Sequence, residues 1–142
     1  MTEATHQMTS NPLGANMQKA GFVGIVTSPA VCVMDQQGVQ KQTGEEGEVC
    51  IKGDNVTPGY ENNPEANLAS FTNGWFRTGD QGLIDEDGYL KITGRLKEII
   101  NRGGEKVSPL EIDNVFMEHE AVEQVVTFGV KDKLLGEAIG VA

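Results

Sequence analysis

Two groups of polar residues in this chain have types and spacing that suit a ligand bearing hydroxyl groups or negative charge. The first is Asp80, which ends the run Trp-Phe-Arg-Thr-Gly-Asp that starts at Trp75. A carboxylate held by a tight Thr-Gly turn can accept hydrogen bonds from both hydroxyls of a ribose, and such charged bonds contribute about 1.5–3 kcal/mol each. Taken alone, the residues favour a simpler interpretation, an Asx-type turn in which Asp80 caps Gly82.

The second group is a basic segment in an acidic chain. The formal net charge is −10, yet basic side chains outnumber acidic ones over residues 95–106: Arg95, Lys97, Arg102 and Lys106 against Glu98 and Glu105. A local excess of positive charge attracts anions, although such a cluster is more often a solvated face. The overall acidity argues against nucleic acid as a main partner, because phosphate binding needs clustered Lys and Arg.

Both groups belong to longer motifs that resemble a known family. The run ending at Asp80 and the run from Gly94 to Pro109 (Gly-Arg-Leu-Lys-Glu-Ile-Ile-Asn-Arg-Gly-Gly-Glu-Lys-Val-Ser-Pro) are similar, in order and separation, to motifs of the adenylate-forming superfamily. That superfamily includes acyl-CoA synthetases, luciferases and peptide-synthetase adenylation domains. Met1 to Glu3 resembles the middle of a third family motif, aromatic-x-Thr-Glu, and the resemblance covers nearly all 142 residues.

The resemblance implies a nucleotide site. Asp80 and Arg95 would bind the ribose hydroxyls, Ile92 would pack near the adenosine and Asn101 would lie near the bound adenylate. The hydroxyl of Thr2 would contact the α-phosphate. Seen without the family, Arg95 is equally a surface ion-pair residue and Ile92 an ordinary core residue.

The same resemblance implies a metal, a hinge and a thiol channel. Glu3 would help to hold Mg²⁺, which accompanies ATP. Lys97 would be the hinge about which a small domain rotates between two half-reactions. Gly103 and Gly104 would line the pantetheine channel for CoA, because residues without Cβ let a chain pass close to the backbone; a plain hairpin turn is the alternative. His6 would contact the substrate, where an imidazole suits the distal carboxylate of a small diacid, and a generic loop histidine is the alternative.

Short strands and turns dominate the first part of the chain. Alternation and turn residues predict strands at 31–34, 47–53, 82–84 and 89–93, with a Gly-ended hairpin turn between the last two. Residues 55–71 read as a loop leading into a short helix from Pro64 to Phe71. In the strand over 47–53, polar and apolar residues alternate.

The second part changes character. Ser108, Pro109 and Glu111 form a capping-box pattern that predicts a helix start. The helix is expected to bury one face, made of Ile112, Val115, Phe116 and His119, and an apolar strand is expected over 121–130.

These elements predict a mixed α/β (α+β) fold with a boundary near Gly94. By the family resemblance, residues 1–94 would be the C-terminal part of a large AMP-binding domain, including part of its distorted β-barrel, and residues 95–142 the first half of a small α+β domain. Cys32 and Cys50 lie singly within apolar runs without metal-ligand spacing, so buried free thiols are expected. No apolar run approaches the roughly 18 residues of a membrane span.

The resemblance implies an ATP-dependent acid–CoA ligase that uses Mg²⁺, ATP and CoA, with oxalate or another short carboxylic acid as the preferred substrate. The run from Met1 to Met8, together with the later run from Asn101 to Pro109, resembles the oxalate–CoA ligase group of plants and fungi. This resemblance also suggests a cytoplasmic or peroxisomal location. A medium- or long-chain fatty acid is the second substrate choice, and a peptide-synthetase adenylation domain or a non-catalytic truncated module are the alternatives. The upstream phosphate loop and the C-terminal lysine of the family are not found here, so we expect a fragment that is inactive by itself.

Overall fold

The computed structural model describes residues 1–5, 7–14 and 17–142. The chain divides into two compact units, Met1–Ile92 and Thr93–Ala142, and each is described by itself. The predicted mixed α/β class is confirmed. The division falls within β7 (Tyr89–Arg95), two residues before the predicted boundary at Gly94. The assignment of these units to parts of two enzyme domains stays a prediction.

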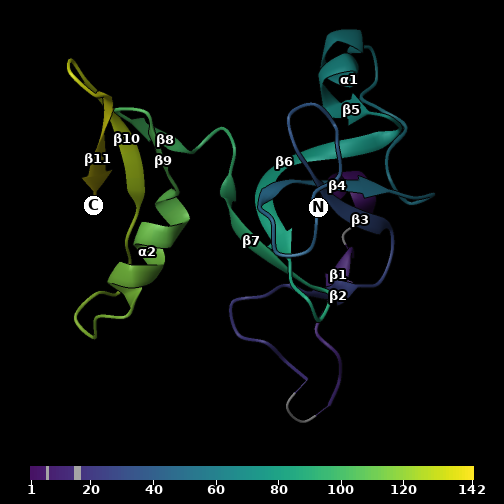
Figure 1. The fold of residues 1–142 in the computed structure, drawn as a ribbon, viewed down its shortest axis with the longest axis horizontal. Coiled ribbons are helices and arrows are strands. Elements are labelled where there is room, and N and C mark those ends of the chain that lie inside the picture. Colours follow the sequence, from purple (N-terminus) through teal and green to yellow (C-terminus); the bar gives the residue numbers. More distant parts are fainter. Residues whose placement is uncertain (6, 15–16) are drawn as a thin grey trace. The chain divides into compact units, whose positions relative to one another are not determined.

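The first unit is built on a mainly antiparallel sheet (Figure 1). Its strands run in the order β1-β2-β7-β6-β4-β3, and β5 pairs with β6. The elements are η1 (Thr2–Ala4), β1 (Thr9–Ser10), β2 (Gly24–Val26), β3 (Ala30–Met34), β4 (Gly47–Lys52), α1 (Pro64–Ser70), β5 (Phe71–Thr72), β6 (Trp75–Ile84) and β7.

Local signals explain several of these elements. Asn63 caps α1 by accepting from the Ala66 amide at 3.1 Å, and Pro64 stands at the helix start as predicted. The β6–β7 hairpin is also confirmed: its turn closes through Asp85, whose carboxylate accepts from the Tyr89 amide at 2.8 Å, and Gly88 has φ +81°. Lys19 makes ion pairs with Asp85 and Asp87, which fasten the segment before β2 to this turn.

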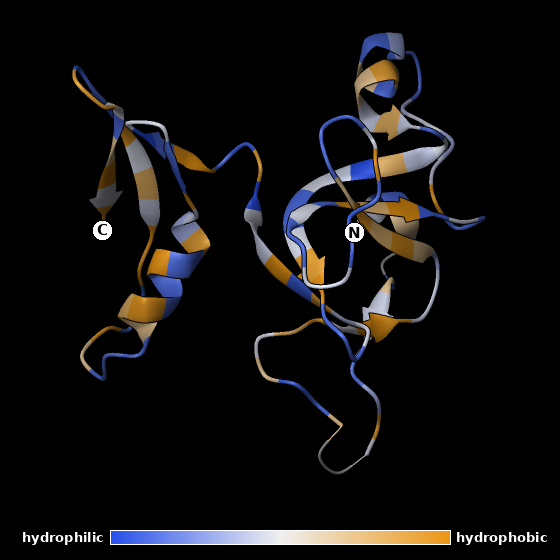
Figure 2. Cartoon of the chain, viewed as in Figure 1, coloured by the Kyte–Doolittle hydropathy of each residue, from blue (hydrophilic) through white to orange (hydrophobic). Residues whose placement is uncertain are grey.

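The core of the first unit lies around β4. Ile51 is fully buried with Ala4 and Phe76, and Phe71 packs against them. Figure 2 shows hydrophobic segments, in orange, on the strands of this unit. The strand predicted here is found, but burial does not follow the alternation of its residues: four consecutive residues, Glu48 through Ile51, are all buried. β4 is an interior strand between β3 and β6, and side chains cover both of its faces: Ala4 and Phe76 pack with Ile51, and Arg77 pairs with Glu48.

The second unit pairs a four-stranded sheet with one helix. Its order is β10-β11-β8-β9, with β8 (Ile100–Arg102), β9 (Glu105–Val107), α2 (Pro109–Met117), β10 (Thr127–Asp132) and β11 (Gly136–Val141). Along the chain, two strands precede the predicted helix and two strands follow it. The strand expected over 121–130 begins only at Thr127, because turns follow α2 and the ladder with β11 starts at the Thr127–Val141 pair.

Two details of α2 differ from expectation. Ser108 stands at the N-cap and Pro109 starts the helix, but no side-chain cap bond forms, since the Ser108 hydroxyl donates to the Thr93 carbonyl at 2.5 Å. The predicted buried face is also wrong: Val115 is 64% and Phe116 43% exposed. His119 lies beyond the helix end, where its Nδ1 accepts from the Ala121 amide. Helix α2 packs only partly on β10, which leaves all of its residues outside the core.

The two cysteines are free thiols, as predicted, and lie opposite each other on β3 and β4. Cys50 is buried as expected, whereas Cys32 is only half-buried. Burial raises the pKa of Cys32 to about 11. Burial raises the pKa of Cys50 to about 12, and the nearby Glu48 carboxylate adds to the effect. Both groups are therefore neutral thiols at physiological pH.

We expect both thiols to be unreactive in the folded protein. At pH 8 the raised pKa values leave far less than about 1% of either group as the thiolate, the form that attacks disulfide reagents. Ellman's reagent should label the folded chain at least ten times more slowly than the urea-unfolded chain. Reactivity should increase only as the pH rises toward 11. Rapid labelling of the folded protein at pH 7.5 would contradict this description.

Candidate nucleotide site

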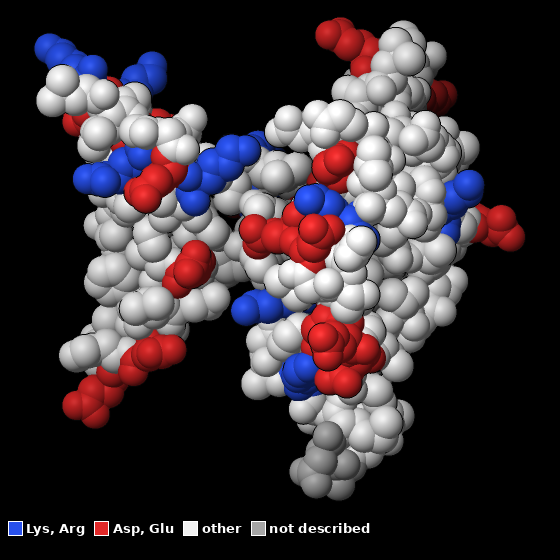
Figure 3. Space-filling model, in the orientation of Figure 1, with Lys and Arg blue, Asp and Glu red and all other residues white. Residues whose placement is uncertain are grey.

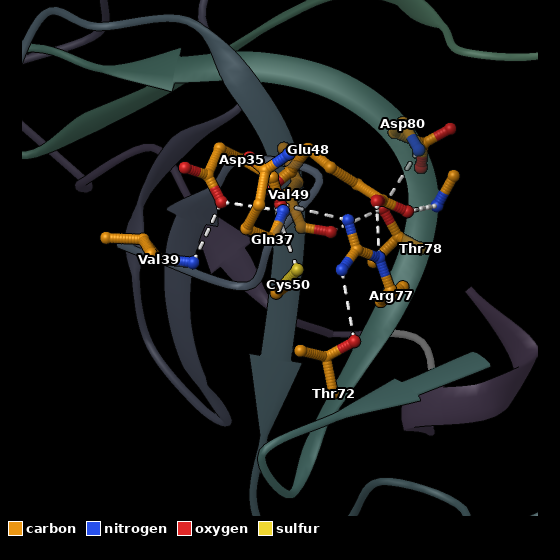
Figure 4. A network of polar contacts seen from close by, with 11 residues as sticks. Asp35, Gln37, Val39, Glu48, Val49, Cys50, Thr72, Arg77, Thr78 and Asp80 are labelled. Atoms are coloured by element: carbon orange, nitrogen blue, oxygen red, sulfur yellow. Dashed lines mark hydrogen bonds and ion pairs between the residues drawn. The ribbon is translucent and has the colours of Figure 1, made fainter. Parts of the chain in front are cut away.

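The run Thr78 to Asp80 forms a bulge in β6 rather than the predicted tight turn (Figure 4). In the ladder between β4 and β6, Glu48 pairs with Gln81 and Cys50 pairs with Arg77. Three residues of β6 thus lie opposite the single residue Val49. Bulges interrupt a ladder and re-aim side chains, and they are frequent beside active sites.

Side chains replace the ladder bonds that the bulge removes. Thr78 donates its hydroxyl to the Val49 carbonyl at 2.9 Å and accepts from the Asp80 amide at 3.0 Å. The Gly79 amide donates to a carboxylate oxygen of Glu48 at 3.0 Å. Gly79 has φ +75°, a conformation that favours glycine. Asp80 is half-buried, and side chains accept from its own amide and from the amide of Gly79 before it.

Glu48 is the residue of this site that sequence reasoning missed. It belongs to the buried stretch of β4 and is only 8% exposed. Its carboxylate forms an ion pair with the Arg77 guanidinium at 2.7 Å, the residue just before the bulge. A glutamate inside the otherwise apolar run Glu-Val-Cys-Ile was the available signal, since a buried charge requires a partner.

Thr2 and Glu3 lie in η1, which the buried Ala4 anchors to the core beside Ile51. The backbone carbonyl of Glu3 accepts from the Thr57 amide at 2.7 Å. Its carboxylate accepts from the Tyr60 hydroxyl at 3.3 Å. Burial, with the adjacent Glu3 charge, raises the pKa of Tyr60, so this hydroxyl stays protonated as a donor.

A single half-buried carboxylate such as that of Glu3 fits Mg²⁺ that arrives with a nucleotide. Magnesium usually takes one or two protein carboxylates and completes its shell with phosphate oxygens and water. Within the described residues no group of three or more metal-binding side chains occurs, so a dedicated protein cage for a metal is not found there.

The remaining predicted residues lie in or near the second unit. Ile92 is half-buried on β7 at the end of the first unit, and Arg95 is exposed at the end of that strand. Lys97 is exposed in the turn that follows, where the Arg95 carbonyl accepts from the amides of Glu98 at 2.9 Å and Ile99 at 3.2 Å.

Gly103 and Gly104 form the two-residue loop between β8 and β9. Their φ values are +61° and +97°, and Arg102 pairs with Glu105 across the loop. Positive φ at both positions is typical of a type I′ hairpin turn, which explains the glycine pair locally. Asn101 supports the turn, since its side-chain oxygen accepts from the Gly104 amide at 3.1 Å.

The structure thus assigns Thr2, Glu3, Asp80 and Ile92 to the first unit and Arg95, Lys97, Asn101 and the glycine pair to the second. His6 lies outside the described residues. Acidic side chains gather on the visible face of the first unit (Figure 3). The helices of the described ranges are all too short or too polar to cross a bilayer.

Comparisons with known proteins point in one direction. The model of the AMP-binding enzyme family matches residues 1–61. The whole chain aligns at 52% identity with an oxalate–CoA ligase of Arabidopsis thaliana, covering 28% of that protein. It aligns at 48% identity with an oxalate–CoA ligase of Saccharomyces cerevisiae, covering 26% of it.

A solved structure agrees with these relatives. The o-succinylbenzoate CoA synthetase of Bacillus subtilis, in complex with its acyl-adenylate intermediate, superposes with a TM-score of 0.88 at 34% identity; the match covers 99% of this chain and 29% of that one. The chain thus spans under a third of the length of the proteins it matches. With matching motifs, sequence and fold, the chain belongs to the adenylate-forming superfamily of AMP-binding enzymes.

Proposed function

We propose that this chain is part of an ATP-dependent acid–CoA ligase. In the first half-reaction a substrate carboxylate attacks the α-phosphorus of ATP, and acyl-AMP forms as pyrophosphate leaves. In the second, the CoA thiol attacks the acyl carbon and AMP leaves. The observation that carries the proposal is the alignment of the entire chain, at about half identity, with two ligases named for oxalate.

The nucleotide would be bound mainly by the first unit. Asp80, at the bulge, accepts hydrogen bonds from the ribose hydroxyls, and Arg95 adds a donor to the same sugar. Ile92 packs against the adenosine, and Asn101 lies near the adenylate. Thr2 donates to the α-phosphate and Glu3 holds Mg²⁺, which offsets phosphate charge while pyrophosphate departs.

The acid is proposed to be oxalate or another short carboxylic acid, with His6 as a contact of the carboxylate that does not react. CoA would enter beside Gly103 and Gly104 after rotation about Lys97. A cytoplasmic or peroxisomal location is also proposed, and it rests only on the resemblance to oxalate ligases.

The proposal is tested in a chimera in which this chain replaces the aligned segment of the Arabidopsis relative. The chimera should form oxalyl-CoA from oxalate, ATP and CoA. Asp80→Ala should raise the KM for ATP at least tenfold, which corresponds to about 1.4 kcal/mol, because the ribose loses charged hydrogen bonds.

The matched control is Glu86→Ala, which removes one exposed carboxylate from the turn of the same hairpin. It should leave the KM for ATP unchanged. An inactive but folded chimera would contradict the ligase proposal. An Asp80→Ala variant with the original KM and rate would reduce Asp80 to a structural residue of the bulge.

A further inference from the structure

The residue that calls for explanation is Glu48. A carboxylate that is 8% exposed in a strand between two others has left most of its hydration. Removing a charge from water costs free energy unless ion pairs and hydrogen bonds compensate for it. Neither of the two proposed half-reactions uses the Glu48 carboxylate.

Both carboxylate oxygens of Glu48 accept hydrogen bonds from β6. One oxygen accepts from the Arg77 Nε at 2.7 Å. The other accepts from the Gly79 amide at 3.0 Å. The carboxylate therefore ties together the residue before the bulge and the residue in its middle (Figure 4).

Arg77 is itself fixed by further contacts. Its guanidinium also donates to the Thr72 hydroxyl at 3.0 Å and to the Asp35 carbonyl at 3.1 Å. These partners belong to β5 and to the turn after β3. The side chains of Arg77 and Glu48 are only 15% and 10% exposed, so solvent screens the pair weakly. Through Arg77, Glu48 is therefore connected to β5 and to the turn after β3.

We propose that Glu48 is a positioning residue for the nucleotide site, which with Arg77 holds the bulge in the geometry that presents Asp80. The inference rests on the proposed role of Asp80. Stability alone does not require this pair, because apolar residues of similar volume often replace a buried ion pair without loss. The bulge does require it, since the Gly79 amide has left the β4 ladder and takes its acceptor from position 48.

The first test measures the bulge in the 142-residue chain by amide hydrogen exchange. In Glu48→Leu the Gly79 amide should exchange at least tenfold faster relative to the amide of Phe76, which lies on β6 before the bulge. Glu48→Gln keeps one acceptor oxygen and should show a smaller change. The matched control is Glu46→Gln. Glu46 also accepts a hydrogen bond from a residue of β6, the Gln81 side chain at 2.8 Å, but Gln81 lies outside the bulge.

The second test separates positioning from stability in the chimera. The apolar pair Glu48→Leu with Arg77→Met should still unfold cooperatively in urea, at a somewhat lower concentration than the original pair because the Gly79 amide loses its acceptor. Its KM for ATP should nevertheless rise at least fivefold, with the KM for the acid unchanged, and Glu46→Gln should leave both constants unchanged. If the double variant fails to fold, Glu48→Gln carries the test with an expected smaller rise.

The outcomes distinguish this inference from the function on which it rests. If Asp80→Ala raises the KM for ATP and the Glu48 variants do not, the positioning role is overturned while the ligase stands. If Gly79 exchange is unchanged in Glu48→Leu, the positioning role is likewise overturned. If Asp80→Ala has no effect, the proposed nucleotide site fails even where Gly79 exchange responds as expected.

Discussion

Lys97→Pro in the chimera should reduce the transfer of the acyl group to CoA at least a hundredfold and leave adenylation nearly unchanged. Lys97 lies in the exposed turn that closes on the Arg95 carbonyl, and the proposed rotation changes its backbone dihedrals. Proline would restrict φ to about −65° and would also restrict Leu96, so one of the two orientations becomes unfavourable. Acid-dependent pyrophosphate exchange measures the first half-reaction, and oxalyl-CoA formation from preformed adenylate measures the second.

Lys97→Ala is the matched control, because it removes the side chain and its charge but leaves the backbone free to rotate. Both half-reactions should survive this change within a few-fold. Gly104→Leu offers a comparison. It should also spare adenylation, but it would impair transfer to CoA by filling the proposed pantetheine channel. Equal slowing of both half-reactions by Lys97→Pro, or of neither, would show that Lys97 is an ordinary surface lysine.

Gly24→Ala should destabilise the chain by about 3 kcal/mol or more, the largest effect expected of a single methyl group here. Gly24 has φ +103°, and an added Cβ would lie 2.2 Å from the Ser10 carbonyl carbon and 2.4 Å from the Asn11 amide nitrogen. All of these atoms are backbone, so β1 would have to separate from β2. Urea unfolding followed by circular dichroism measures the loss.

Gly21→Ala isolates the cost of the backbone conformation. Gly21 has φ +79°, but an added Cβ there meets no atom within 4 Å. This variant should lose only about 1 kcal/mol. Equal losses for the two variants would mean that the close approach of β1 to Gly24 does not constrain the sheet.

Local chemistry made several elements of this chain predictable. The Asp85–Gly88 turn, Pro64 at the start of α1 and the turn glycines at 103 and 104 depend on residues a few positions apart, and the structure has all three. The family followed from motif residues and their order, and the comparisons agree. The roles of the predicted site residues, and a hinge at Lys97, stay predictions.

Long-range pairing decided the rest. Glu48 and Gly79 are 31 positions apart, and nothing near Asp80 in the chain indicates that the strand bulges there instead of turning. The Ser108 hydroxyl donates to a carbonyl 15 positions earlier. The N-cap position was predicted correctly, but the hydrogen bond that this side chain makes was not. The periodicity of α2 describes which residues share a face, but whether that face is buried depends on what packs against it. Sequence alone therefore determined the Asp85–Gly88 and Gly103–Gly104 turns, the start of α1 and the family. The bulge and its buried acceptor came from strands brought together by the fold, because such contacts join residues that no local pattern relates.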